Sequence, residues 1–241
     1  MRICLIQTGA IGDIVIALPI AHWYYKRGCE VFWPVDSDFV QFLAYAAPYV
    51  NFLPVDNTKF PRGTYNYFMG APLAYANQLG SSKTFTMYSH LGSLELGHRE
   101  FAHSLKFDEY KYAVCEVPFS EKWKLQIRRN VAQESLIARQ LPEKQSYCIL
   151  HEQGGEGSNF TKALGHFYPE SEYGKHIRIS SITSSPFDWL LAFENANTLA
   201  FIDSLHANLA EQLNITTRKY LHLRSPVNFT PVFKNGWNIR A

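Results

Sequence analysis

The chain has 241 residues, of which 46% are apolar, so it is long enough to form one large domain or two small ones. Its formal net charge of +2 at pH 7 is small and evenly spread, which argues against a nucleic-acid partner. The chain opens with no signal-peptide pattern, and no apolar run approaches the roughly 18 residues of a membrane span, so we expect a cytoplasmic protein.

The first elements follow a β-α-β-α order. The apolar run Ile3 to Ile6 predicts a buried strand, and the apolar-periodic segment from Ile14 to about Arg27 predicts a helix. The segment "CEVFWPV" predicts a second strand, and "FVQFLAYAAPYV" predicts a second helix. This order is typical of a parallel sheet with crossover helices, and it places Gly9 and Gly12 at a strand-to-helix turn.

The middle of the chain, from Asn57 to about Phe119, yields only short periodic pieces such as "REFAHSLKF". After it, the segment from Lys122 to Leu141 has the pattern of a long amphipathic helix that Pro142 ends.

A second β-α series begins at Tyr147. The segments "YCILH", "HIRISS", "TLAFIDS" and "RKYLHL" predict strands. Between them, "PFDWLLAFENA" predicts a helix that starts at Pro186, and "LHANLAEQL" predicts another. We therefore expect an α/β protein of two Rossmann-like halves, residues 1–141 and 147–241, with the C-terminal half reduced in size.

The loop between the first strand and helix carries an acid, Asp13. Its Gly9-x-x-Gly12 spacing lacks the GxGxxG fingerprint of dinucleotide sites, and the chain contains no GxxxxGK[ST] phosphate loop. A carboxylate in the first helical turn would repel a phosphate bound to the same amides. Asp13 is either a helix cap or a general base for a hydroxyl nucleophile, and the spacing alone leaves both interpretations open.

Two separated segments resemble family 9 glycosyltransferases, the bacterial heptosyltransferase type. "MRICLIQTGAIGDIVIALPI" is similar to the start of these enzymes, with a hydrophobic strand, a small-residue loop ending in Gly-Asp, and an apolar helix. "TLAFIDSLHANLAEQLNI" is similar to their late strand, which ends in Asp-Thr or Asp-Ser and runs into a helix. The two segments occur in the order that the family has.

The resemblance implies the glycosyltransferase B fold, in which two Rossmann-like halves face a cleft. The N-terminal half would bind the acceptor, and the C-terminal half would bind a nucleotide sugar. Asp13 would deprotonate the acceptor hydroxyl as it attacks the anomeric carbon, giving inversion, while Thr8, Gly9 and Gly12 would meet the acceptor and the transferred sugar. No metal and no resident cofactor are expected.

The family pattern also implies donor contacts at the second segment. Asp203 and Ser204 end a strand, and the amides from Ser204 to Ala207 begin a helix that could hold a diphosphate. The chain departs from the family pattern here, because Leu205 replaces a glycine and Asn208 replaces a histidine, although His206 lies nearby. The alternative is that Ser204 merely caps the helix and Asp203 binds a backbone amide.

Two further segments match the donor half loosely. In the glycine-rich segment "HEQGGEGSNFTK", His151 to Lys162, Lys162 could offset diphosphate charge, or the whole loop could be an ordinary solvated one. The stretch "SSPFD" could line the same site or be a plain capping sequence. The donor residues implied by these segments are His151, Gly154, Gly155, Lys162, Ser184 and Ser185.

Rival interpretations remain. Asp36-Ser37-Asp38 is the DxD pattern of metal-dependent glycosyltransferases, but a turn with two solvated acids explains it as well. An NAD(P)-dependent oxidoreductase would use Asp36 to hold a ribose, yet it needs a glycine fingerprint that the first loop lacks. A non-catalytic sugar- or nucleotide-binding module is a third class.

For a transferase, the partners would be a nucleotide-sugar donor and a glycan or glycolipid acceptor. A glycolipid acceptor would be compatible with peripheral contact of the protein with a membrane.

Overall fold

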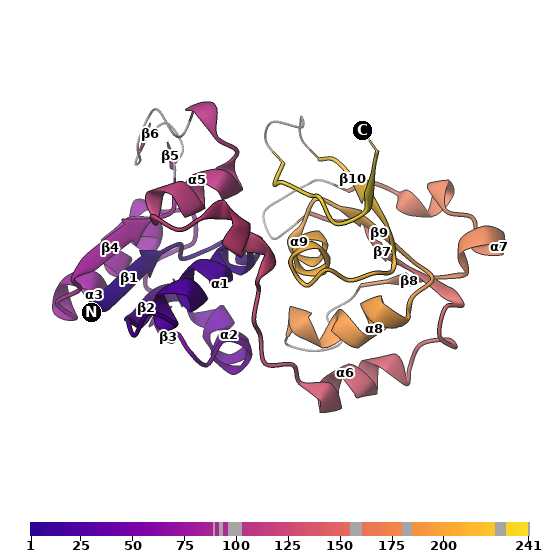
Figure 1. Ribbon diagram of the computed structural model, residues 1–241, viewed down its shortest axis with the longest axis horizontal. Coiled ribbons are helices and arrows are strands. Elements are labelled where there is room, and N and C mark those ends of the chain that lie inside the picture. Colours follow the sequence, from indigo (N-terminus) through magenta and orange to yellow (C-terminus); the bar gives the residue numbers. More distant parts are fainter. Residues whose placement is uncertain are drawn as a thin grey trace. The chain divides into compact units, whose positions relative to one another are not determined.

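The chain forms two compact units, each with its own parallel sheet (Figure 1). The computed structural model describes residues 1–88, 90–91, 94–95, 103–154, 161–179, 185–224 and 230–240. Unit 1 is Met1–Arg128 and unit 2 is Arg129–Ala241. The expected α/β class with two parallel sheets is confirmed. The units divide at Arg128 and Arg129, ahead of the residues 142–146 where the sequence suggested a junction.

Unit 1 is built on a four-stranded parallel sheet in the order β3-β2-β1-β4. Its strands are β1 (Arg2–Ile6), β2 (Glu30–Asp36), β3 (Asn51–Val55) and β4 (Lys83–Thr86). Helices α1 (Ile11–Tyr25) and α2 (Val40–Ala46) connect the first three strands, and α3 (Ala71–Gln78) makes the return crossover to β4. Right-handed crossovers place α3 on the opposite face of the sheet from α1 and α2.

Helix α1 is buried over most of its surface. Residues Ile14 to Ala21 are all buried, because the helix packs on the sheet on one side and against α5 (Phe107–Val114) on the other. Two tyrosine hydroxyls fix this packing: Tyr112 donates to the carbonyl of Ile16 at 2.8 Å, and Tyr24 donates to the carbonyl of Cys115 at 2.6 Å. The helix that carries Asp13 is therefore held rigidly.

The rest of unit 1 is irregular. A π-helical turn (Asn66–Gly70) leads into α3, and the short strands β5 (His90–Leu91) and β6 (Leu94–Glu95) pair antiparallel. A 3-10 turn (Phe119–Trp123) precedes an extended segment that ends the unit.

The helix expected from Lys122 to Leu141 is wrong over its first half. Lys122 lies at the end of the 3-10 turn, where its ammonium makes a fully buried ion pair with Asp108 at 2.6 Å. The true helix, α6 (Val131–Ala138), begins only after Asn130, whose side chain caps it by accepting from the amide of Gln133. Helix α6 packs on α8 (Leu190–Asn195) and belongs to unit 2.

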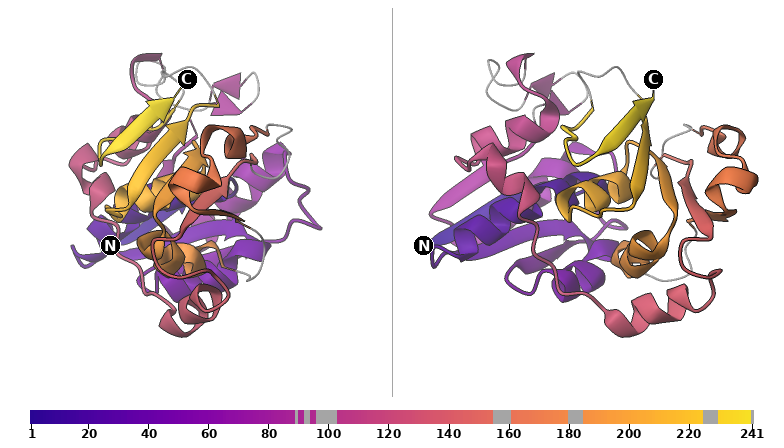
Figure 2. Two further views of the ribbon diagram at one scale, coloured as in Figure 1. Left: turned by 90° about the vertical axis from the view of Figure 1, so that its right-hand side faces the viewer. Right: turned by 45° about the vertical axis from the view of Figure 1, so that its right-hand side comes forward.

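Unit 2 has a five-stranded parallel sheet in the order β11-β10-β9-β7-β8. Its strands are β7 (Tyr147–His151), β8 (Lys175–Arg178), β9 (Thr198–Ile202), β10 (Arg218–His222) and β11 (Trp237–Arg240). Helices α8 (Leu190–Asn195) and α9 (Leu205–Gln212) cover one face, while α7 (Glu170–Tyr173) and the 3-10 turn Leu164–Phe167 lie over the other (Figure 2).

The predicted strands and helices of unit 2 are largely confirmed. The helix expected from Pro186 begins as a 3-10 turn (Pro186–Trp189), which the hydroxyl of Ser185 caps by accepting from the amide of Phe187 at 3.3 Å. Strand β11 was not predicted. Among the helices that the structure describes, none combines the length and the apolar character needed to cross a membrane.

Candidate functional site

Each sheet has one point at which the strand order reverses, and parallel α/β sheets bind ligands at such points. In unit 1 the reversal lies between β1 and β4, so the loop after β1 opens there. In unit 2 it lies between β7 and β9, where the strand ends carrying His151 and Asp203 are neighbours. The predicted catalytic loop and part of the predicted donor site both lie at these points.

In unit 1, Asp13 is in the first turn of α1, and two buried side chains from other elements contact its carboxylate. The amide Nε2 of Gln7 donates to Asp13 Oδ2 at 3.4 Å, and Nζ of Lys111 lies 3.7 Å from the same oxygen. Lys111 also donates to Gln7 Oε1 at 2.6 Å. Asp13 keeps 31% of its side chain exposed. The contacts with the Gln7 amide and the Lys111 ammonium fix the orientation of the Asp13 carboxylate, which remains partly exposed. A carboxylate fixed in this way is suited to accept a proton from a bound hydroxyl.

The amides of the loop already have a partner. The backbone N–H groups of Thr8 and Gly9 both donate to the hydroxyl of Tyr88, at 2.8 Å and 3.2 Å. Gly9 also has no room for a side chain, since a Cβ there would lie 2.9 Å from the hydroxyl oxygen of Tyr67. Ala10 precedes the helix in the left-handed region with φ of 59°, and Gly12 lies within the first helical turn. The start of the loop is therefore closed to a phosphate.

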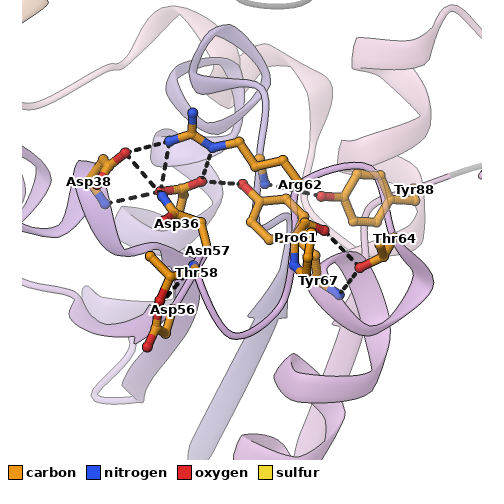
Figure 3. A network of polar contacts seen from close by, with 11 residues as sticks. Asp36, Asp38, Asp56, Asn57, Thr58, Pro61, Arg62, Thr64, Tyr67 and Tyr88 are labelled. Atoms are coloured by element: carbon orange, nitrogen blue, oxygen red, sulfur yellow. Dashed lines mark hydrogen bonds and ion pairs between the residues drawn. The ribbon is translucent and has the colours of Figure 1, made fainter.

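The Asp36-Ser37-Asp38 motif is an internal ion-pair network (Figure 3). The guanidinium of Arg62 bonds to Asp36 at 2.7 Å and to Asp38 at 2.5 Å, and the hydroxyl of Tyr67 donates to Asp36 at 2.6 Å. The side chain of Asp36 is fully buried, whereas that of Asp38 is 63% exposed, so the interpretation of two solvated acids is wrong for Asp36. Burial alone would raise the pKa of the Asp36 carboxyl, but the bonds from Arg62 and Tyr67 hold it below its usual value.

This network argues against the oxidoreductase alternative. A dinucleotide site needs free amides in the first loop and an acid after the second strand that can reach a ribose. Here the amides of Thr8 and Gly9 bond to Tyr88, and Asp36 is buried beneath Arg62 and Tyr67. Arg62 also bonds to both carboxylate oxygens of Asp36 and to Oδ2 of Asp38, with which a DxD motif would hold a cation. Among the described residues, no group of three or more His, Cys, Asp or Glu side chains is placed to bind a metal ion.

In unit 2, three of the predicted donor residues lie together. The hydroxyl of Ser204 and Nδ1 of His151 are 2.9 Å apart, and the rings of His151 and His206 are 4.6 Å apart. Ser204 precedes α9 but makes no side-chain capping bond, because its hydroxyl contacts His151 instead. The first amides of α9 are therefore left without a side-chain cap, as in helix termini that receive anions.

Asp203 and Asn208 complete this region. Asp203 is almost fully buried, and its Oδ1 accepts from the backbone amide and from Nε of Arg224, both at 2.9 Å. Its charge is thus balanced by a cation beside the α9 terminus. The side chain of Asn208 donates to the carbonyl of Ser204 at 2.9 Å, and its Oδ1 is buried with no hydrogen-bond partner.

The two histidines are neutral at physiological pH. Burial, helped by the cation of Arg224, lowers the pKa of His151 to about 4. Burial and the neighbouring His151 lower the pKa of His206 well below its usual value, and neither ring nitrogen of His206 has a hydrogen-bond partner. Neutral imidazoles in this position can exchange hydrogen bonds with hydroxyl groups but add no charge.

The other predicted donor residues either lie elsewhere in unit 2 or fall outside the described residues. Gly155 and Ser184 lie outside the described residues, and Gly154 is half-buried at the start of its loop. Ser185 caps the turn at Pro186, as the plain capping interpretation has it. Lys162 lines a cavity with His222 and Arg240. His222 and Arg240 lie on the opposite face of the sheet from His151, as the strand register shows.

Sequence reasoning missed three side chains: Gln7, Lys111 and Arg224. Gln7 directly follows the first strand and Arg224 follows the last predicted strand, so the rule that ligands meet carboxyl ends of parallel strands could have found both. Lys111 gave no such signal, because its helix lies in the part of the chain that showed only short periodic pieces.

Comparison with known proteins agrees with this architecture. No family model matches the chain, and no curated protein matches its sequence. Solved structures do match. A family 9 glycosyl transferase from Veillonella parvula DSM 2008 has a TM-score of 0.65 at 12% identity, over 99% of this chain and 86% of that one.

Two Escherichia coli structures are also similar. The ADP-heptose LPS heptosyltransferase II has a TM-score of 0.61 at 11% identity, with 100% of this chain and 90% of that one covered. Heptosyltransferase WaaC with ADP has a TM-score of 0.55 at 11% identity, with 99% and 92% covered. The chain therefore has the glycosyltransferase B type of fold, and the resemblance to family 9 glycosyltransferases is confirmed at the level of structure.

Proposed function

We propose that this protein is a glycosyltransferase that moves a sugar from a nucleotide-sugar donor to a hydroxyl group of a saccharide or other acceptor. One observation carries the proposal: Asp13 is a half-exposed carboxylate at the strand-order reversal of unit 1, held by Gln7 and Lys111. The Asp13 carboxylate contacts these two side chains from other elements, which is more than a simple helix cap requires. The similarity of fold to family 9 glycosyltransferases supports the same reaction class.

In the proposed reaction, Asp13 takes the proton of the acceptor hydroxyl while the hydroxyl oxygen attacks the anomeric carbon. The bond from that carbon to the nucleoside diphosphate breaks on the opposite side, so the configuration inverts. The Lys111 ammonium lies 3.7 Å from the carboxylate, and together with the hydrogen bond from Gln7 it limits the rotation of the Asp13 side chain. Unit 1 thus supplies acceptor activation.

Unit 2 supplies the donor site in this proposal. The uncapped first turn of α9, the hydroxyl of Ser204 and the guanidinium of Arg224 would hold the diphosphate and stabilise the charge that develops as it leaves. Because a cation and helix amides perform this task, we propose that no divalent metal is needed. The pairing of Asp36 and Asp38 with Arg62 supports that view.

The solved neighbours suggest which donor to test first. One is named as an ADP-heptose heptosyltransferase and another was solved with ADP, so an ADP-linked heptose is the first candidate donor. The acceptor would be a glycan or glycolipid. We place the activity in the cytoplasm, where the four free, buried cysteines would stay reduced.

The test is a panel of ligands added to the purified protein. Thermal unfolding is followed with ADP-heptose, UDP- and GDP-sugars, NAD(P) and free sugars, and release of nucleoside diphosphate is then measured with candidate acceptors. We expect a nucleotide sugar to raise the melting temperature and turnover to survive excess EDTA. Stabilisation by NAD(P) alone would indicate an oxidoreductase, and stabilisation by free sugar without turnover would indicate a binding module. Activity lost to EDTA and restored by Mn²⁺ would contradict metal independence.

A further inference from the structure

A cavity of about 550 Å³ lies in unit 2 on the face of the sheet that α7 covers. The strand register places it, because Tyr220, Ala200 and Leu150 are paired neighbours and so point to one face. Leu221, Phe201 and His151 are paired in the same way and point to the other. The cavity and the Ser204–His151 contact thus lie on opposite faces of one sheet. Its lining residues are Lys162, Phe167, Tyr168, Tyr173, Tyr220, His222, Ile239 and Arg240.

The charge of this lining is positive. Lys162 and Arg240 are its two cations, and it contains no acidic side chain among the residues that the structure describes. The two cations also act on His222: burial first, and then Lys162 and Arg240, lower the pKa of His222 to about 4. An uncompensated pair of cations beside a partly buried cavity favours an anionic ligand.

The walls are aromatic. Tyr168 packs on Tyr173 with ring centroids 5.2 Å apart and on Tyr220 at 5.0 Å. Phe167, which is 58% exposed, also lines the cavity, and the guanidinium of Arg240 lies 5.7 Å from the ring of Tyr220. Large aromatic surfaces of this kind pack against the apolar faces of flat or ring-shaped ligands.

A polar group at the base of the cavity lacks a full set of partners. His222 is 2% exposed, and its Nε2 contacts the hydroxyl of Tyr168 at 2.6 Å, while its Nδ1 has no hydrogen-bond partner. A histidine buried in this way in a purely structural position normally has both nitrogens satisfied. His222 therefore adds a buried polar group to the cavity lining, and the case for a ligand rests on the two cations and the aromatic walls.

We propose that this cavity binds an anionic saccharide, a sugar that carries a phosphate or carboxylate group, at a site separate from the α9 terminus. The ring would pack on Tyr173 and Tyr220, and the anionic group would lie between Lys162 and Arg240. A nucleotide fits less well, because nucleotide sites use a carboxylate for the ribose or amide side chains for the base, and the lining has neither. The volume is within the roughly 300–1,000 Å³ of small-ligand sites.

The test is calorimetric titration of the whole chain with glucose 6-phosphate, glucuronic acid, glucose, inorganic phosphate and ADP. The variants Lys162→Met and Arg240→Gln remove one cation each, and Lys175→Met, an exposed lysine of the same unit, is the matched control. We expect at least one charged sugar to bind more tightly than glucose or phosphate. Each cation variant should weaken that binding about tenfold or more, while the control leaves it unchanged.

A second comparison separates this site from the proposed donor site. Arg224→Gln should leave charged-sugar binding intact, and Lys162→Met should leave ADP binding intact, because the two sites lie on opposite faces of the sheet. The proposal is overturned if neither charged sugar binds, if glucose binds equally well, or if inorganic phosphate accounts for the whole affinity. It is also overturned if ADP displaces the sugar or if Arg224→Gln abolishes its binding. Because the readout is binding, these outcomes do not depend on whether the chain is a transferase.

Discussion

The ammonium nitrogen of Lys111 lies 3.7 Å from Oδ2 of Asp13, and the side chain of this lysine is only 4% exposed. Lys111 comes from α5, and Asp13 from the start of α1, so the pair joins two elements that are distant in sequence. Gln7 bridges the two by donating to Asp13 and accepting from Lys111. A buried cation is costly unless it is paired, so the fold maintains this arrangement around a carboxylate that stays accessible.

Replacing Asp13 by Asn tests its role as a base. Asparagine keeps the size of the side chain and its ability to bond to Gln7 but cannot accept the acceptor proton. We expect turnover with the active donor to fall roughly a hundredfold or more, with a loss of unfolding free energy of about 1 kcal/mol or less. The rate is measured as nucleoside diphosphate release under saturating donor. Glu30→Gln, an exposed acid of β2, is the control, and near-normal turnover in Asp13→Asn would leave Asp13 as a helix cap.

Lys111→Met removes the cation while keeping the length of the side chain. Asp13 then loses its charged neighbour, and Gln7 Oε1 loses a buried donor, so we expect kcat to fall about tenfold with little change in KM for the donor. The free energy of unfolding should fall by about 1–3 kcal/mol, because a buried acceptor is left unsatisfied. Lys124→Met, an exposed lysine paired with Glu121, is the matched control. A rise in KM with unchanged kcat would contradict a role in positioning the base.

Much of the fold followed from local patterns. The apolar run of β1, the loop with Gly9 and Gly12, and the apolar α1 occur together near the start of the chain, and a similar strand-to-helix series recurs around Ser204. Buried parallel strands have continuous apolar runs, which are easy to identify. The end of a strand also indicates where a ligand site opens, so Asp13 and Ser204 could be selected from the sequence.

Other features depend on contacts that no local pattern encodes. The segment after Lys122 has a helical period, yet the buried pair of Lys122 with Asp108 holds its start in a 3-10 turn. The DxD motif looked solvated, because nothing in its neighbourhood showed that Arg62, about two dozen residues later, would cover it. Lys111 was missed for the same reason, because it acts on Asp13, which is far from it in sequence.

The buried histidines of unit 2 predict acid sensitivity. Burial lowers the pKa of His206, so the unfolded chain binds a proton that the folded chain does not as the pH falls below about 6.5. The titration of His206 therefore leaves the free energy of unfolding unchanged above that pH and lowers it progressively below it. In His206→Phe, the loss of unfolding free energy between about pH 7.5 and pH 5 should be smaller by on the order of 1 kcal/mol. Urea unfolding measures this, with the exposed His166→Gln as the control. Equal losses in the wild type and in His206→Phe would contradict it.

The last prediction concerns where the nucleotide binds, and it rests on the charges near the two helix termini. The start of α1 carries Asp13, and the amides of Thr8 and Gly9 already bond to Tyr88. The start of α9 has no acid in its first turn, and Arg224 balances the nearby Asp203. An anion should therefore prefer the second terminus.

Arg224→Gln should weaken ADP binding about tenfold or more, since it removes a charged hydrogen-bond donor. Arg224→Lys, which keeps the cation, should recover part of the affinity. Calorimetric titration provides the measurement, and Arg139→Gln, which makes the same charge change at an exposed arginine directly after α6, is the control. Because Asp203 is buried and loses a partner in Arg224→Gln, thermal unfolding of each variant must show that it is folded at the titration temperature.

Asp13→Asn should leave ADP affinity unchanged, because in this assignment unit 1 meets only the acceptor and the transferred sugar. If Asp13→Asn alters ADP affinity and Arg224→Gln does not, the nucleotide belongs to the loop after β1, and the assignment of the donor to unit 2 is wrong.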